Sequence, residues 1–187
     1  MEESNNQSNQ QGQLNQLNLL APLLAKEDCA SCKFCCSFRR QSLWETPVFD
    51  EETMKALQSA FPQAKFRSAG DSGKSYSFDI SQNYKTDDPE EEAACPFLDG
   101  KNGCSLSPEL KPFDCKIWPL RAVCLPRTEK LAVALTPTCP AINKQPLEKI
   151  IELADSGLGE KILSYAAAHP DIIKEYSSFL SNIVYNK

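Results

Sequence analysis

The chain has 187 residues, enough for one domain that buries its own hydrophobic core. Its formal net charge of −5 argues against nucleic acid as an electrostatically held partner. No Lys or Arg precedes Lys26, so the apolar run LNLLAPLLA lacks the basic start of a signal peptide, and it is too short to span a bilayer. We therefore expect a cytoplasmic protein with no membrane partner, in a reducing compartment where clustered cysteines bind metal more often than they form disulfides.

The first half of the chain predicts a tail, two helices and a hairpin. Residues 1–13 are rich in Gln, Asn and Ser and are expected to be disordered. A short helix is expected to lead into the cysteines, with the apolar residues Leu14, Leu17, Leu20 and Leu24. A second helix is expected behind Asp50 as its cap, ending at Pro62, with a buried face of Met54, Leu57 and Phe61. Residues 65–80 are expected to form a hairpin, because apolar and polar side chains alternate over residues 75–80, behind a Gly-rich turn.

The second half predicts short strands followed by helices. The acidic run 87–92 is expected to be a solvated loop, and two short strands are expected around the turn DGKNG. A further hairpin is expected from Val123 to Leu135, turning at PRTEK. Helical spacing then predicts two helix faces, one with Leu147, Ile150, Ile151 and Ala154, the other with Ile172, Tyr176, Phe179, Leu180 and Ile183.

The predicted fold class is α+β: a small, cysteine-rich, loop-heavy metal-binding core with short β-hairpins and a C-terminal helical segment. Behind the tail, residues 14–187 are expected to form a single domain. Within it, residues 14–142 are the cysteine-cluster metal-binding region and residues 143–187 the C-terminal helices.

The stretch EDCASCKFCCSFRR places four of the nine cysteines within eight positions, namely Cys29, Cys32, Cys35 and Cys36. Two C-x-x-C turns overlap here, so three sulfurs can wrap around one centre. Cys36 directly follows Cys35 and would more easily serve a second centre or another side of the same one. The remaining cysteines are widely spaced along the chain: Cys95, Cys104, Cys115, Cys124 and Cys139. We interpret this density of thiols as a metal site.

The ordered motifs CASCKFCC, CPFLDGKNGC, CKIWPL and CPAI resemble the bacterial CxxCxxCC cysteine-cluster family, described as zinc- or iron-chelating proteins. The resemblance covers residues 29–142. It implies eight metal ligands: Cys29, Cys32, Cys35, Cys36, Cys95, Cys104, Cys115 and Cys139. Many members carry Gly where this chain has Phe34, and Cys124 has no counterpart in the pattern. A similar cluster occurs in a flagellin lysine N-methylase.

All-thiolate ligation fits an iron–sulfur cluster, expected to be [4Fe–4S], and also fits zinc. Three cysteines at x2–x2 spacing without a second C-x-x-C pair favour the iron–sulfur cluster. The single histidine, His169, is expected to be a solvated residue at a helix end. Several basic residues lie near the cysteines and could stabilise an anionic centre: Lys33, Arg39, Arg40, Lys111, Lys116 and Arg121.

Two functions remain open from the sequence. One is a metal-binding module with a redox or electron-transfer role; the other is a protein-modifying enzyme, such as a lysine methyltransferase, with the cluster beside its substrate site. Either implies an unidentified protein partner or substrate. Radical-SAM, phosphate-loop and dinucleotide motifs are incomplete. For example, Arg39 stands where the radical-SAM loop needs its third cysteine, and Ser68 replaces the first glycine of a phosphate loop.

Overall fold

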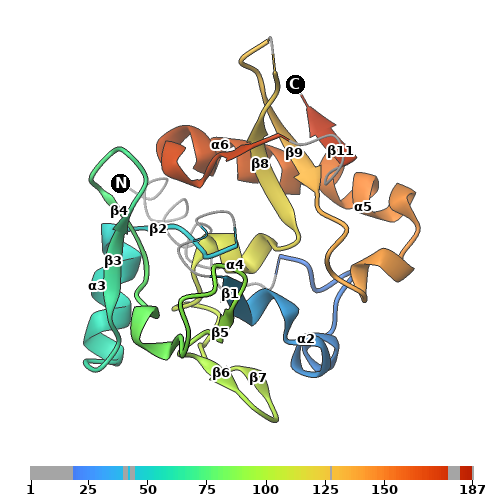
Figure 1. Cartoon of the computed structure of the whole chain (residues 1–187). Helices are drawn as coiled ribbons and strands as arrows, with labels where there is room; N and C mark the ends of the chain where they lie inside the picture. The colour runs from blue at the N-terminus through green and yellow to red at the C-terminus, as the bar shows by residue number, and fades with distance from the viewer. Residues whose placement is uncertain (1–18, 40–41, 43–44, 127, 177–181, 187) are drawn as a thin grey trace, which may run out of the picture.

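A computed structural model describes residues 19–39, 42, 45–126, 128–176 and 182–186 (Figure 1). This part of the chain contains five α-helices and eleven strands. The helices are α2 (Lys26–Cys32), α3 (Glu51–Ala60), α4 (Phe113–Ile117), α5 (Leu147–Leu153) and α6 (Gly159–Ala168). The mixture confirms the α+β class.

The largest sheet has four strands in the order β10–β8–β9–β11. Its strands are β8 (Leu120–Cys124), β9 (Leu131–Leu135), β10 (Lys174–Glu175) and β11 (Asn182–Asn186). The β8–β9 hairpin confirms the strands predicted around the PRTEK turn, while β10 pairs in parallel with β8 and β11 pairs antiparallel with β9. Helix α6 packs against β8 and β9, and α5 lies beside β11 (Figure 1).

The other sheets are small. A three-stranded sheet in the order β2–β4–β3 has the strands β2 (Phe49–Asp50), β3 (Phe66–Ala69) and β4 (Ser75–Phe78). Two strand pairs are β1 (Ser37–Arg39) with β5 (Glu92–Ala94), and β6 (Leu98–Asp99) with β7 (Gly103–Cys104). The predicted hairpins β3–β4 and β6–β7 are confirmed. The acidic run is exposed except for the partly buried Glu91, and its last residue begins β5.

Helix α3 begins and ends where the sequence predicted. The Asp50 carboxylate accepts a hydrogen bond from the Thr53 backbone N–H at 2.7 Å, and the helix ends at Ala60, just before Phe61 and Pro62. Leu57 is fully buried, because it faces the second of two large hydrophobic clusters. Satisfying the first helical N–H groups in this way fixes the position of the helix start.

Two large hydrophobic clusters fill the interior. The first combines the four-stranded sheet with α5 and α6, and includes Leu120, Val133 and Ile162. The second is aromatic and joins α3 to the smaller sheets; its buried members are Phe38, Phe49, Leu57, Phe78, Ile80, Ala93, Phe97 and Leu106. In Figure 1 the smaller sheets and α3 lie on one side of α4 and the four-stranded sheet lies on the other. The chain segments that carry the cysteines therefore run between two cores.

The predicted helix through Ile172 and Ile183 is wrong. The described residues there form a 3-10 turn (Pro170–Ile172) and the edge strands β10 and β11. Ile172 and Val184 are buried in the first core, so the apolar residues are internal but in a different conformation. The middle of that segment, including Phe179 and Leu180, lies outside the described residues.

The predicted helix before the cysteines is only partly covered. Leu14, Leu17 and the tail 1–13 lie outside the described residues. Leu20 and Leu24 are buried in a turn, and α2 starts at Lys26. In the described part of the chain, no helix combines the length and apolar character needed to cross a membrane.

Candidate metal centre

The N-terminal cysteine loop is a helix followed by a tight turn. Helix α2 carries Cys29 and Cys32, and it ends at Lys33, whose backbone is left-handed with φ of 56°. The Lys33 N–H donates to the Cys29 carbonyl at 3.1 Å, which closes the last helical turn. Residues Phe34–Cys36 then form a 3-10 helix. This reversal of the backbone brings Cys35 back toward the end of α2.

The remaining predicted ligands come from four separate segments. Cys95 follows β5, and its N–H donates to the Cys36 carbonyl at 2.7 Å, so the β1–β5 pairing places these two residues side by side. Cys104 ends β7, Cys115 lies in α4, and Cys139 follows β9. Long-range pairing therefore brings sulfur atoms together that are far apart in the sequence.

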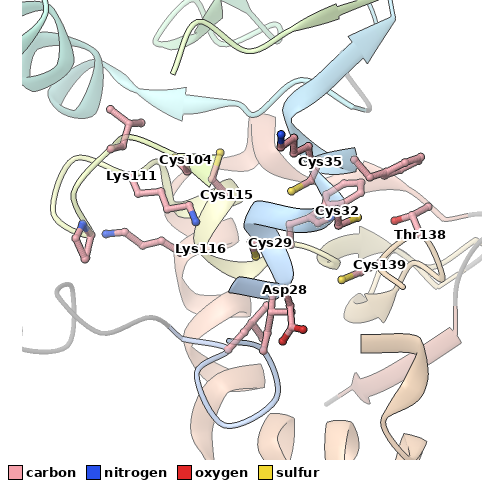
Figure 2. A pocket seen from close by; sticks show the side chains of 17 residues that line it. Asp28, Cys29, Cys32, Cys35, Cys104, Lys111, Cys115, Lys116, Thr138 and Cys139 are labelled. Atoms are coloured by element: carbon pink, nitrogen blue, oxygen red, sulfur yellow. The ribbon is translucent and has the colours of Figure 1, made fainter. Parts of the chain in front are cut away.

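The cysteines surround two adjoining cavities. The larger cavity measures about 250 Å³ and is lined by Cys29, Cys32, Cys35, Cys104, Cys115 and Cys139 (Figure 2). The smaller measures about 50 Å³ and is lined by Cys29, Cys35, Cys36, Cys95, Cys104 and Cys115. The structure thus brings together all eight predicted ligand positions. Cys124 lines neither cavity and is exposed at the end of β8.

All nine cysteines lie in the described part of the chain, and each is a free thiol. Within the described residues, no three His, Cys, Asp or Glu side chains are arranged to hold a single metal ion. The eight thiols therefore share two cavities, and their role as ligands stays a prediction.

Burial makes these thiols weak acids. It raises the pKa of Cys29 to about 11 and that of Cys95 to about 12. Desolvation by burial also raises the pKa of the Cys115 thiol well above its usual range. A hydrogen bond with Cys36 raises the pKa of Cys35. A metal would have to displace these protons, because the thiolate is the ligand.

Lys111 extends its ammonium group among the sulfur atoms (Figure 2). Burial alone would lower the pKa of Lys111, but the charges of Cys115, Cys104, Cys29 and Cys35 together raise it. Among the described residues no carboxylate pairs with this ammonium. An ammonium held inside a ring of thiols is most stable when some of them are thiolates, which is the state that a metal would create.

A buried charge cluster that the sequence analysis missed lies next to the smaller cavity. Asp114 and Arg121 are 1% and 2% exposed, with 2.8 Å between Oδ1 and Nη1. Lys174 Nζ lies 3.9 Å from Asp114 Oδ2, which also accepts the Val48 N–H at 3.0 Å. The Arg121 guanidinium stacks on Trp118, 4.0 Å from the ring centroid. The cluster contains two cations and one carboxylate, and its members Asp114 and Arg121 line the smaller cavity, as does Glu45.

The other basic residues named from the sequence have different positions. Lys33 donates to the Gly100 carbonyl, Arg39 forms an ion pair with Glu90 at 2.9 Å, and Lys116 lines the larger cavity. Arg40 lies outside the described residues. His169 follows α6, which confirms its position at a helix end, but it is partly buried rather than solvated, with its ring centroid 4.3 Å from that of Tyr165.

Sequence reasoning could have identified Asp114, because it adjoins a cysteine in the CKIWPL motif, but nothing in the local pattern marks it as buried. Its partner Lys174 could not be identified, since the residues around it were expected to be helical.

Comparison of the chain with family models, with curated proteins and with solved structures found no match in any of the three. The resemblance to the CxxCxxCC family therefore rests on the cysteine motifs.

Proposed function

We propose that the chain is a thiolate metal-binding protein that holds an iron–sulfur cluster at the larger cavity and serves in redox chemistry or electron transfer. The observation that carries the proposal is the gathering of six cysteines around one cavity of about 250 Å³. A single zinc ion bound at about 2.3 Å from each sulfur needs no such space, whereas a cluster of irons and sulfides does.

The charges around the cavity support the same proposal. Four thiolates on a cubane carry a net negative charge, and the lysines that line the larger cavity are Lys33, Lys111 and Lys116. Such neighbours stabilise the bound, anionic state. When bound, an iron–sulfur cluster would supply one-electron transfer. The methyltransferase alternative rests on the sequence resemblance alone.

The cavity also reaches the surface of the protein. Phe34, at its rim, is 51% exposed, although it is a large apolar side chain. We propose that the electron partner or protein substrate contacts this face, because here the cavity that would hold the cluster opens to solvent.

The decisive experiment is purification without oxygen. We expect brown protein that contains iron and acid-labile sulfide in about equal amounts and that loses its colour with dithionite or air. Colourless protein carrying zinc, inert to reductant because zinc has no redox chemistry, would overturn the iron–sulfur proposal.

Two matched variants test the role of the cysteines. Cys32→Ser, at the centre of the loop, should lose metal and stability, because binding energy at such a site is also folding energy. Cys124→Ser is the control and should keep the metal, since Cys124 is exposed and lines neither cavity. Equal loss of metal in both variants would contradict the assignment.

A further inference from the structure

The eight thiols around the cavities are not equivalent. Half of them line both cavities, namely Cys29, Cys35, Cys104 and Cys115. Cys32 and Cys139 line only the larger cavity, and Cys36 and Cys95 line only the smaller one. The four thiols that line both cavities therefore lie between the pair Cys32 and Cys139 and the pair Cys36 and Cys95. A single centre bound by all eight thiols would not require them to be divided between two cavities.

Backbone pairing gathers one set at the smaller cavity. The 2.7 Å hydrogen bond from Cys95 N–H to the Cys36 carbonyl joins two of its members. Leu98 connects Cys95 to Cys104. Its N–H donates to the Cys95 carbonyl at 3.0 Å, and it pairs with Cys104 across β6–β7. Both Cys95 and Cys104 pack against the aromatic second core.

Cys115 belongs with this set. It lines the smaller cavity together with Cys36, Cys95 and Cys104. In Figure 2 the sulfur atoms of Cys104 and Cys115 lie together beside Lys111, on the opposite side of the cavity from Cys139.

The other set is held by the α2 turn and the segment after β9. Cys29 and Cys139 both pack against the first core. Cys32 and Cys35 line the larger cavity together with these two residues. In Figure 2, Cys32 and Cys139 lie on the side of the cavity away from Lys111, and Cys29 and Cys35 lie between these two residues and Lys111.

We propose that the eight cysteines form two metal centres of four thiolates each, one held by Cys29, Cys32, Cys35 and Cys139, the other by Cys36, Cys95, Cys104 and Cys115. This inference rests on the proposed metal-binding function. The two sets meet at the consecutive residues Cys35 and Cys36, whose thiols are hydrogen-bonded to each other. Two centres joined through one peptide bond would be close enough to exchange electrons directly.

The test counts centres in protein isolated without oxygen. Native mass spectrometry, with iron, zinc and sulfide analysis, is applied to the wild type and to two double variants. Cys32→Ser with Cys139→Ser removes two ligands unique to the first set, and Cys36→Ser with Cys95→Ser removes two unique to the second. Cys124→Ser is the control. Each double variant should lose one centre and keep the other, and the control should keep both.

Several results would overturn the proposal. A single centre in the wild type would overturn the two-centre proposal but leave the metal-binding function intact. A double variant that loses both centres, or neither, would also overturn the two-centre proposal. Because a double variant could fail to fold, the mass of the intact wild-type complex gives the count of centres without any substitution. If the wild type carries two zinc ions, the iron–sulfur function fails but the division is supported. Wild type without metal overturns both.

Discussion

The most consequential residue outside the cysteines is Asp114. Its carboxylate is buried, faces Arg121 and Lys174, and accepts the Val48 N–H. The residue thereby neutralises part of a positive cluster and anchors the chain just before β2 to helix α4. Removal of one partner from such a group leaves an uncompensated buried charge. The free energy of unfolding then falls by more than the intact pair contributes to it.

Asp114→Ala should lower the free energy of unfolding by about 3–5 kcal/mol, because two buried cations lose their counterion. Guanidinium unfolding, followed by circular dichroism without oxygen, measures this loss. The control is Asp87→Ala, at an exposed loop position, which should change stability by no more than about 0.5 kcal/mol. Equal effects of the two substitutions would show that the buried cluster is not stabilising.

The stability should also depend on Lys174 through pH. Burial lowers the pKa of Lys174 from 10.5 to about 8, so between these values the unfolded chain holds a proton that the folded chain has released. The free energy of unfolding should therefore rise with pH across this window, by about 1–3 kcal/mol relative to Lys174→Met. Urea unfolding of both proteins between pH 7 and 10 measures the difference.

The matched control is Lys130→Met, an exposed position in the β8–β9 turn, which should follow the wild-type curve. If the gap between wild type and Lys174→Met stays constant over this range, Lys174 has the same pKa in the folded and unfolded states, and the prediction fails.

At the scale of elements, the β6–β7 hairpin is fixed against helix α2. Gly103 has a positive φ of 76°, and a Cβ placed on it would come within 3.0 Å of the Ala30 Cα. Ala30 lies between Cys29 and Cys32, and Gly103 precedes Cys104. The close approach of these two backbones therefore determines how far Cys104 lies from the cysteines of α2.

Gly103→Ala should push the hairpin away from α2, reduce the metal content and cost roughly 2–3 kcal/mol, from backbone strain plus overpacking. Gly73→Ala separates the two effects, because Gly73 also has a positive φ of 69° but no atom lies within 4 Å of the added Cβ. It should cost only about 1–2 kcal/mol and keep the metal. Metal analysis and thermal unfolding measure both, and the prediction fails if the two variants retain metal equally.

Local signals explain which elements could be predicted. Helix α3 has a capping Asp50, a periodic apolar face and a terminating proline; β4 shows strand alternation, and turn residues mark the hairpins β3–β4 and β8–β9. The C-terminal prediction failed because apolar residues at helical spacing are also compatible with a 3-10 turn, as at Ile172, and with an edge strand, as at Ile183. Pairing of β10 with β8 is decided by distant chain segments, and no local pattern contains it. The same holds for the site: the cysteines could be named, but their division between cavities depends on which core each segment packs against.

At the scale of the whole molecule, the cysteine segments join two hydrophobic cores. Cys29 and Cys139 pack against the core of the four-stranded sheet, whereas Cys95 and Cys104 pack against the aromatic core. Each core has its own sheet and helices, so each can keep part of its structure independently. We infer that bound metal would act as a link between them.

Removal of metal should therefore loosen the cysteine segments that join the two cores before it unfolds the cores themselves. Hydrogen exchange measured with and without metal should show faster exchange in residues 27–39, 92–106 and 111–117, with little change in β8 and β9, whose Ala122 and Val133 are buried in the first core. Thermal stability should fall as well. A uniform rise in exchange over the whole chain, or none at all, would contradict a role for the metal at this junction.

The wide separation of the cysteines also has a consequence for biosynthesis. Cys139 is the last of the eight, and more than half of the chain lies between it and the N-terminal loop. At roughly 5–20 residues per second, a ribosome needs on the order of ten seconds to add that length. During this time the nascent chain displays Cys29, Cys32, Cys35 and Cys36 without the thiols that complete the cavities. If the proposed centres form, the set with Cys139 can be completed only after that residue is synthesised, whereas the set that ends at Cys115 can be completed earlier.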